Sequence, residues 1–360
     1  MSKIIVYGKN FYNNIALNNF NIDFEYVEKL RKLVTTKTLF GHAVPFSRAY
    51  KVDWYENIFD TSIPNWQLYS TISFEEATEQ RSQELIQVYE NEDIPIVVNW
   101  SGGIDSTLIL ASIHKNFPDY LKKRVIVSMN NTSFCENPYF YNKIIKPHYK
   151  VSFIDTHNYI DNFMLHGDPA DAFWIQGGVI NLSSKLNVSE DDVNSNPENF
   201  VNFYKSKGFT IDESLWYLNF YIDTAKDYNI QLKTTLDLLW WSNFSCHLNF
   251  SVTKLLTKID RKLLIPQTNY IDIYKKHAIP WYLSNAYQVW SIQSQLNGSK
   301  FDGSVRNYKM EAKEYIYNVD KNLYYRDYKT KVQSLTPHSN STESFSDSVI
   351  DNTGKFIRNI

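Results

Sequence analysis

The sequence predicts an α/β protein built on a doubly wound parallel sheet, with a helical C-terminal part and a small N-terminal region. Three observations predict this fold. Between Ile94 and about residue 165, short apolar runs alternate with helical patterns, as they do in βαβ units. A glycine-containing turn at residues 101–106 joins the first apolar run to the first of these helices. Beyond about residue 172 the pattern becomes mostly helical.

The first elements are marked by a helix cap, an apolar run and a proline. Ser73-Phe-Glu-Glu76 is a capping box, which predicts a helix from Phe74 to about Tyr89. The apolar run from Ile94 to Trp100 predicts a strand. The pattern from Ser106 to Asn116 predicts a helix, which ends before Pro118 because proline does not fit a helix interior.

Further strands and helices continue the alternation. Val125-Ile-Val127 and Val151-Ser-Phe-Ile154 are predicted to be the second and third strands. Helices are predicted from Tyr139 to Lys146 and from Asn158 to Leu165. Parallel strands joined by right-handed crossovers bind ligands at their carboxyl ends, so a site is expected at residues 101–106.

The sequence divides into three regions. Residues 1–72 form an aromatic-rich N-terminal region to which no role is assigned, and residues 73–332 form the sheet domain with its helical part. Within that part, Trp240 and Trp241 lie in an apolar helical stretch and are expected to pack in the core. Residues 333–360 are rich in serine, bury too little apolar surface to order themselves, and are expected to be a flexible tail.

Composition narrows the class of protein. The 360 residues include 43% hydrophobic and 16% aromatic residues, which are globular values. A net charge of -2 gives no basic footprint, so nucleic acid is not expected as a partner. The two cysteines, Cys135 and Cys246, are too few for a disulfide framework or a paired-cysteine zinc site. No signal peptide and no apolar span of 18 residues are evident, so we expect a cytoplasmic protein without a membrane partner.

The turn Ser101-Gly102-Gly103-Ile104-Asp105-Ser106, here called the Ser-Gly-Gly loop, has the features of a phosphate site. Its glycines let backbone N–H groups approach an anion, its serines add hydroxyl donors, and the following helix N-terminus attracts negative charge. Asp105 would repel a phosphate unless a divalent cation lies between them, so the loop predicts a nucleotide bound with Mg²⁺. A Walker loop requires a lysine after its glycines, and none follows here.

A second acidic turn follows in the sequence Gly167-Asp168-Pro169-Ala170-Asp171-Ala172. The glycine and the proline favour a tight turn that displays Asp168 and Asp171 three residues apart. Two acids facing a nucleotide hold Mg²⁺ or polarise a substrate. The alternative is that Asp171 caps the next helix.

These motifs resemble those of a known family. The Ser-Gly-Gly loop is similar to the Ser-Gly-Gly-x-Asp-Ser signature of the PP-loop ATP pyrophosphatases, the adenine nucleotide alpha-hydrolase-like proteins that split ATP between its α and β phosphates. Residues 167–172 resemble the Gly-Glu-Gly-Ala-Asp-Glu loop of the synthetase domain of asparagine synthetases. Weaker likenesses follow in the same order at residues 264–280 and 313–329, so the resemblance covers roughly residues 75–332.

The resemblance implies ATP and Mg²⁺ as cofactors. It implies roles for the residues at matching positions: phosphate binding by Ser101, Gly102, Gly103, Asp105 and Ser106; Mg²⁺ and pyrophosphate binding by Asp105 and Asp171; and catalytic positions at Asp168, Glu136 and Lys329. Lys329 would stabilise charge as pyrophosphate departs, with Lys331 as its alternative. The other interpretation of both lysines is that they are solvated cations on a surface helix.

The sequence also departs from the family's pattern. Pro169 and Ala172 replace a glycine and an acid of the second loop, and Asp168 is one methylene shorter than the family's glutamate. Position 2 is Ser2 where glutamine-dependent relatives expose a cysteine nucleophile, and residues 1–72 are too short for their glutaminase domain. Free ammonia, another amine or an intramolecular amine is therefore the expected nucleophile if the protein is a ligase.

The leading hypothesis is an AMP- and pyrophosphate-forming ligase, which adenylates a carboxylate or amide-like oxygen of a small molecule for attack by ammonia or an amine. One alternative is a PP-loop enzyme that modifies a nucleobase, although relatives of that kind use clustered cysteines. The other is a degenerate protein that binds a nucleotide without catalysis, an interpretation that Pro169 and Ala172 favour.

Overall fold

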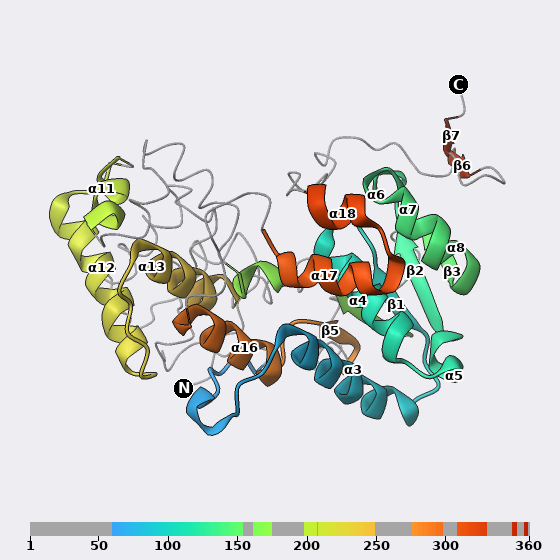
Figure 1. Cartoon of the computed structure of the whole chain (residues 1–360), viewed down its shortest axis with the longest axis horizontal. Coiled ribbons are helices and arrows are strands. Elements are labelled where there is room, and N and C mark those ends of the chain that lie inside the picture. The colour runs from blue at the N-terminus through green and yellow to red at the C-terminus, as the bar shows by residue number, and fades with distance from the viewer. Residues whose placement is uncertain are drawn as a thin grey trace, which may run out of the picture. The chain divides into compact units, whose positions relative to one another are not determined.

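The chain forms two compact units, each assembled from segments that are distant in sequence. A computed structural model describes residues 60–153, 161–174, 198–206, 208–248, 276–297, 308–329, 348–350 and 356–358 (Figure 1). The sheet unit comprises Ser73–Gly167, Asp272–Trp281 and Tyr308–Ile360, and the helical unit comprises Met1–Ile72, Asp168–Ile271 and Tyr282–Asn307. The predicted domain of residues 73–332 therefore contains segments of both units.

A five-stranded, all-parallel sheet is the centre of the sheet unit. Its order is β3-β2-β1-β4-β5, so the chain moves outward from β1 in one direction to β2 and β3 and in the other to β4 and β5. The strands are β1 (Ile96–Asn99), β2 (Val125–Met129), β3 (Lys150–Phe153), β4 (Phe163–His166) and β5 (Ala278–Pro280). The predicted α/β class with a parallel sheet is confirmed, and the reversal of strand order lies between β1 and β4, where such sheets bind ligands.

The central strands are buried, which explains their continuous apolar sequences. Ile96, Val97 and Val98 of β1 have no exposed surface, and β1 has a neighbour on each side. Side chains on both faces of such a strand meet protein instead of water, so an alternating polar pattern is not expected. The predicted first three strands are confirmed.

One predicted element is wrong. The sequence from Asn158 to Leu165 was interpreted as a helix, but residues 163–165 belong to β4, which pairs with β1 and β5. All four residues of β4 are buried. A short apolar run fits a buried strand and a buried helix equally well, and pairing on both edges decides in favour of the strand. Residues 154–160 lie outside the described part of the chain.

Three helices of the sheet unit pack against one another: α3 (Phe74–Glu90), α4 (Ile104–Asn116) and α17 (Met310–Asp320). The capping box of α3 is confirmed, because Ser73 Oγ accepts a hydrogen bond from the Glu76 amide and Glu76 accepts one from the Ser73 amide. The short α5 (Asp119–Lys122) follows α4 and precedes β2.

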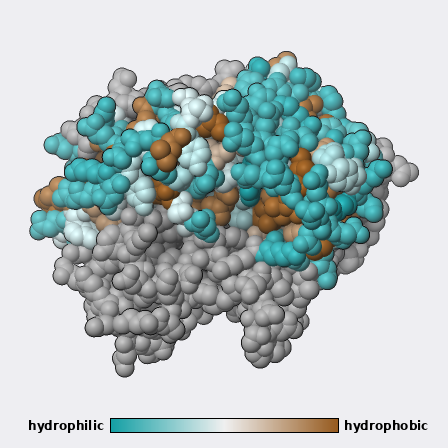
Figure 2. Space-filling view, turned by 90° about the horizontal axis from the view of Figure 1, so that it is seen from below, coloured by the Kyte–Doolittle hydropathy of each residue, from teal (hydrophilic) through white to brown (hydrophobic). Residues whose placement is uncertain are grey.

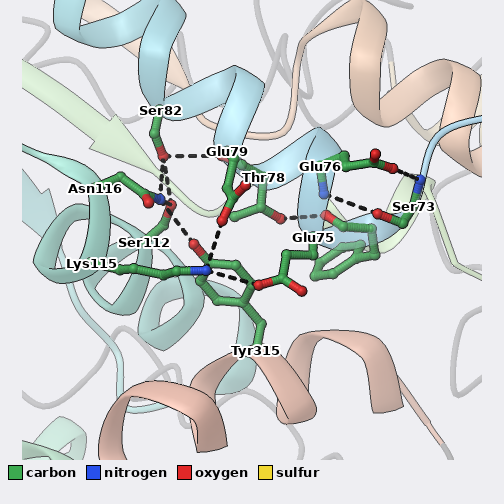
Figure 3. A network of polar contacts seen from close by, with 11 residues as sticks. Ser73, Glu75, Glu76, Thr78, Glu79, Ser82, Ser112, Lys115, Asn116 and Tyr315 are labelled. Carbon is green, nitrogen blue, oxygen red and sulfur yellow. Dashed lines mark hydrogen bonds and ion pairs between the residues drawn. The ribbon is translucent and has the colours of Figure 1, made fainter.

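A polar network joins these three helices (Figure 3). The hydroxyls of Ser82 and Ser112 are 2.6 Å apart, and the Asn116 amide donates to both and to the Tyr315 hydroxyl, 2.9 Å away. Lys115 lies over the Tyr315 ring and pairs with two glutamates of α3. Because these polar groups satisfy one another, they fix the position of α17 on α3 and α4.

The connection between β2 and β3 consists of short helical segments. It contains α6 (Asn131–Glu136), α7 (Pro138–Phe140), the π-turn Tyr141–Ile145 and α8 (Lys146–His148), so the predicted helix from Tyr139 to Lys146 is confirmed. After α17, the chain continues into α18 (Leu323–Tyr328).

The described part of the helical unit is rich in aromatic side chains. Trp240 and Trp241 are fully buried, as predicted, and their indole N–H groups donate to Ser291 and Thr224. Among the described residues, the unit's elements are the turns Trp66–Leu68, Ala170–Ala172 and Asn243–His247 and the helices α11 (Glu198–Ser206), α12 (Ile211–Lys226), α13 (Thr235–Ser242) and α16 (Asn285–Leu296).

The predicted flexible tail contains a short hairpin. Strands β6 (Ser348–Ile350) and β7 (Phe356–Arg358) pair antiparallel, so these six residues have regular structure that the sequence analysis did not predict. The rest of residues 333–360 lies outside the described part of the chain.

The described surface is mixed in character. On the face shown in Figure 2, hydrophilic residues cover most of the coloured surface and apolar ones form scattered patches. No helix in the described ranges is long and apolar enough to cross a membrane.

Candidate functional site

The Ser-Gly-Gly loop follows β1 directly and leads into α4. The amide of Ser101 donates to Ser106 Oγ at 3.0 Å, the two serine hydroxyls are 3.0 Å apart, and the Gly103 amide donates to Ser101 Oγ at 3.3 Å. Both hydroxyls thus lie inside the turn, beside the N-terminus of α4, where Gly103 is the N-cap residue. A 13-residue helix with a glycine N-cap leaves its first amides to an anion.

Gly102 holds the loop against the crossover helix α6. Its φ of +82° lies in the left-handed region, and a Cβ at this position would lie 2.3 Å from the Ser133 carbonyl oxygen and 2.8 Å from Glu136 Cβ. A side chain fits neither the backbone conformation nor the space. The motif therefore requires glycine here, and this close approach places Glu136 beside the loop.

The end of β4 approaches the same loop. A Cβ on Gly167 would lie 3.4 Å from Asp105 Cβ and 3.5 Å from the Ser106 nitrogen. One residue earlier, the buried His166 Nδ1 is 3.3 Å from Asn99 Nδ2, at the end of β1. The ends of β1 and β4, between which the strand order reverses, thus both lie beside residues 101–106.

Lys309 forms an ion pair with Asp105. Asp105 is the second residue of α4, and its side chain is 31% exposed, whereas that of Lys309 is 2% exposed. Their contact joins positions 204 residues apart. The sequence analysis assigned a role to Asp105 and none to Lys309.

Lys309 stands at an unfavourable position for a lysine. It is the N-cap residue of α17 with a φ of +52°, a left-handed conformation that costs a residue with a side chain about 1–2 kcal/mol. A cation at a helix N-terminus opposes the helix dipole, and burial removes the ammonium from water. Asparagine or glycine would suit the backbone better, and either would lack the contact with Asp105.

Glu136 and Lys329 form a second ion pair beside the loop. Lys329 Nζ lies 2.7 Å from Glu136 Oε1, and the two side chains are 11% and 14% exposed. Lys329 is the C-cap residue of α18, and Glu136 is the last residue of α6. The structure thus brings together two of the residues predicted to be catalytic, and a Cβ on Gly103 would lie 3.4 Å from the same Glu136 oxygen.

Tyr325 holds α18 against the loop. Its hydroxyl donates to the Gly102 carbonyl at 3.3 Å, and its ring lies below the Lys329 ammonium, 5.9 Å from ring centre to Nζ. Burial raises the pKa of this phenol, with smaller contributions from Glu136 and Asp105, so it stays protonated and serves as a donor. The sequence analysis did not find Tyr325, because its role depends on contacts with residues more than 200 positions earlier.

The chain was compared with protein-family models, with curated proteins and with solved structures. No match was found.

Asp168 and Asp171 belong to the helical unit. Both are partly exposed, and Asp171 lies within the turn Ala170–Ala172, where its carbonyl accepts a hydrogen bond from Asn243. The N-cap residue of that turn is Pro169, and the capping of a following helix by Asp171 stays a prediction, because residues 175–197 lie outside the described part of the chain. Asp168 follows directly after Gly167, the last residue of the sheet unit's first segment. The joint binding of Mg²⁺ by Asp105 and Asp171 stays a prediction, and Lys331 lies outside the described residues.

The donor set of the loop fits a metal ion that is shared with phosphates. No group of three metal-ligating side chains occurs within the described residues. Mg²⁺ in nucleotide sites commonly takes one or two carboxylates, with phosphate oxygens and water as the other ligands. The single, partly exposed carboxylate of Asp105 beside the amides of α4 satisfies that requirement.

Proposed function

We propose that the protein is an ATP-dependent ligase that releases AMP and pyrophosphate. One observation carries this proposal: two lysine side chains meet at the Ser-Gly-Gly loop, which lies where the strand order reverses. Lys309 contacts Asp105 within the loop, and Lys329 contacts Glu136 beside it. A site with donor amides, two cations and two carboxylates suits a polyphosphate with Mg²⁺. The acceptor we propose is a small-molecule carboxylate or amide-like oxygen, and the final nucleophile is ammonia or an amine.

In the first step, an oxygen of the substrate attacks the α-phosphorus of ATP, and the bond from this phosphorus to the bridging oxygen of pyrophosphate breaks. The backbone amides of the loop hold the phosphates in line. Asp105 would hold Mg²⁺, which supplies charge neutralisation to the phosphates. Lys329 donates to the departing pyrophosphate, and Tyr325 keeps α18 in position to present it.

In the second step, the nitrogen attacks the activated carbon, the bond from carbon to the AMP oxygen breaks, and the nitrogen loses a proton. Glu136, paired with Lys329 beside the loop, is the candidate group in the sheet unit for receiving that proton. Asp168 of the second loop remains the proposed catalytic acid, on the family resemblance alone.

The test is ATP cleavage by the purified protein. ATP labelled at the α-phosphate is incubated with Mg²⁺, ammonium and a panel of small carboxylic acids, and AMP is separated from ADP. We expect AMP and an equal amount of pyrophosphate, both abolished in Asp105→Asn and retained in Asp119→Asn, whose carboxylate is 92% exposed on α5. Formation of ADP, or equal AMP formation by the Asp105→Asn variant, would contradict the proposal.

A second candidate function is nucleotide binding without catalysis. The observation that favours it is that Asp105 and Lys329 already have oppositely charged partners in the fold. Equilibrium dialysis with labelled ATP separates the two functions. A protein that binds ATP with Mg²⁺ and forms no AMP with any acid and amine of a broad metabolite extract would be of the second kind.

A further inference from the structure

We infer that Lys309 is a partner-exchanging residue: it neutralises Asp105 in the fold and transfers to a phosphate oxygen when Asp105 turns to a metal ion. This inference rests on the proposed polyphosphate site and specifies how that site selects its ligand. A metal ion and a phosphate would enter together. The metal ion competes with Lys309 for Asp105, and the phosphate competes with Asp105 for Lys309.

The first argument is the position of Lys309. Burial, a left-handed backbone and a helix N-terminus all disfavour a lysine there, as described above. Conformations of this kind cluster at functional sites, and Lys309 combines one with burial and a helix N-terminus, whereas Lys321 is exposed and lies at a helix C-terminus. The contact with Asp105 alone does not require such a residue, because Asp105 lies in the first turn of α4, where the helix dipole already stabilises a carboxylate.

The second argument is electrostatic. A divalent cation that takes Asp105 alone removes an opposite charge from beside a 2% exposed ammonium, and weakening the pairing of a buried charge is costly. A phosphate alone approaches Lys309 only by approaching the Asp105 carboxylate as well, and like charges repel. When both enter, Asp105 contacts the metal, Lys309 contacts phosphate, and each charge keeps an opposite charge beside it.

The third argument is steric. The Gly167 backbone packs on Asp105 Cβ and on the start of α4, so it holds the base of the Asp105 side chain in place. The Asp105 side chain as a whole is 31% exposed, and Asp105 is itself a residue of the Ser-Gly-Gly loop. The Asp105 oxygen and the Lys309 ammonium are therefore adjacent to the amides that would receive a phosphate.

The experiment measures metal and nucleotide binding separately, without turnover. Mn²⁺ alone is titrated by electron paramagnetic resonance, and α,β-methylene-ATP with Mg²⁺ is titrated by calorimetry. In Lys309→Met we expect Mn²⁺ alone to bind at least about tenfold more tightly than in the wild type, because Asp105 has lost its competitor. We expect the nucleotide analogue to bind at least about tenfold more weakly, because a charged contact to phosphate is lost.

The matched control is Lys321→Met. Lys321 is also left-handed, with a φ of +61°, and it caps the opposite end of α17 in an exposed position. Neither binding constant should change in this variant. If Lys309→Met does not fold, Lys309→Asn replaces it, since asparagine tolerates the left-handed region and caps helices.

Three results would overturn the inference. Unchanged binding of both probes shows that Lys309 does not exchange, and weaker binding of both shows a purely structural role. Both of these leave the proposed function intact if the wild type binds the analogue. Failure of the wild type to bind the analogue overturns the proposed polyphosphate site as well, so the two failures are distinguishable.

Discussion

Replacing Gly102 by alanine tests the close approach between the Ser-Gly-Gly loop and α6. A left-handed alanine costs about 1–2 kcal/mol. Its Cβ would also lie 2.3 Å from a backbone oxygen of Ser133, and overpacking of this kind costs about 1–3 kcal/mol because backbone yields poorly. Alanine recovers about 0.4–1 kcal/mol by restricting the unfolded chain. The expected loss in free energy of unfolding is therefore about 1–4.6 kcal/mol, with a central value of about 3 kcal/mol.

Urea denaturation followed by circular dichroism measures this loss. Gly103→Ala is the neighbouring control, because its φ of -73° is ordinary and its Cβ would meet only side-chain oxygens, at 3.3 and 3.4 Å. Gly208→Ala is the conformational control, because its φ is +87° and nothing lies within 4 Å of its Cβ. Both should lose about 1 kcal/mol or less. The reasoning is refuted if Gly102→Ala loses no more stability than Gly208→Ala.

Three further predictions concern charged groups of the sheet unit. Glu136→Gln and Lys329→Met should each lower the free energy of unfolding by about 2–3 kcal/mol. The double variant should lose about 1–3 kcal/mol less than the sum of the two single losses. Additive losses in this double-mutant cycle would show that the pair is not coupled. Burial raises the pKa of Asp320, so the contribution of its protonated form to folding stability is present at low pH and lost as pH rises. Asp320→Asn should therefore be more stable than the wild type at pH 7. In thermal melts, this difference in stability should shrink toward pH 4. Burial, followed by the neighbouring His148, lowers the pKa of His114, so folding stability that is present above pH 6.5 is lost as pH falls. In thermal melts between pH 7 and 5, His114→Gln should lose less stability than the wild type. Parallel stability curves for the two proteins would contradict this prediction.

Local signals in the sequence predicted the elements whose physical cause is local. The α3 cap depends on Ser73 and Glu76, which are three residues apart, and the Ser-Gly-Gly loop is a contiguous motif. The strand β4 was predicted as part of a helix because its three apolar residues are too few to show a period, and only its pairing with β1 and β5 identifies it as a strand. The three-residue β5 was likewise not predicted.

Prediction of the site was partial for the same reason. Glu136 and Lys329 were identified through a family resemblance, and their ion pair in the structure gives them a shared place beside the loop. Lys309 carried no signal, because a lysine before a helix is not a capping residue and its partner lies 204 positions away. A buried long-range ion pair depends on the finished fold, which no spacing in the sequence encodes.

The discontinuous make-up of the sheet unit has a consequence for how the protein is synthesised. Its first four strands and the Ser-Gly-Gly loop are complete by residue 167, whereas β5, Lys309 and Lys329 come from its later segments. At about 5–20 residues per second, the ribosome needs on the order of ten to thirty seconds to add the intervening part. During that interval β4 is an open sheet edge because β5 has not been synthesised, and the ion pair of Asp105 with Lys309 has not formed. A nascent chain halted before residue 309 should therefore be the form most dependent on chaperones. Asp105 and Glu136 form their ion pairs at the loop only after Lys309 and Lys329 have been synthesised.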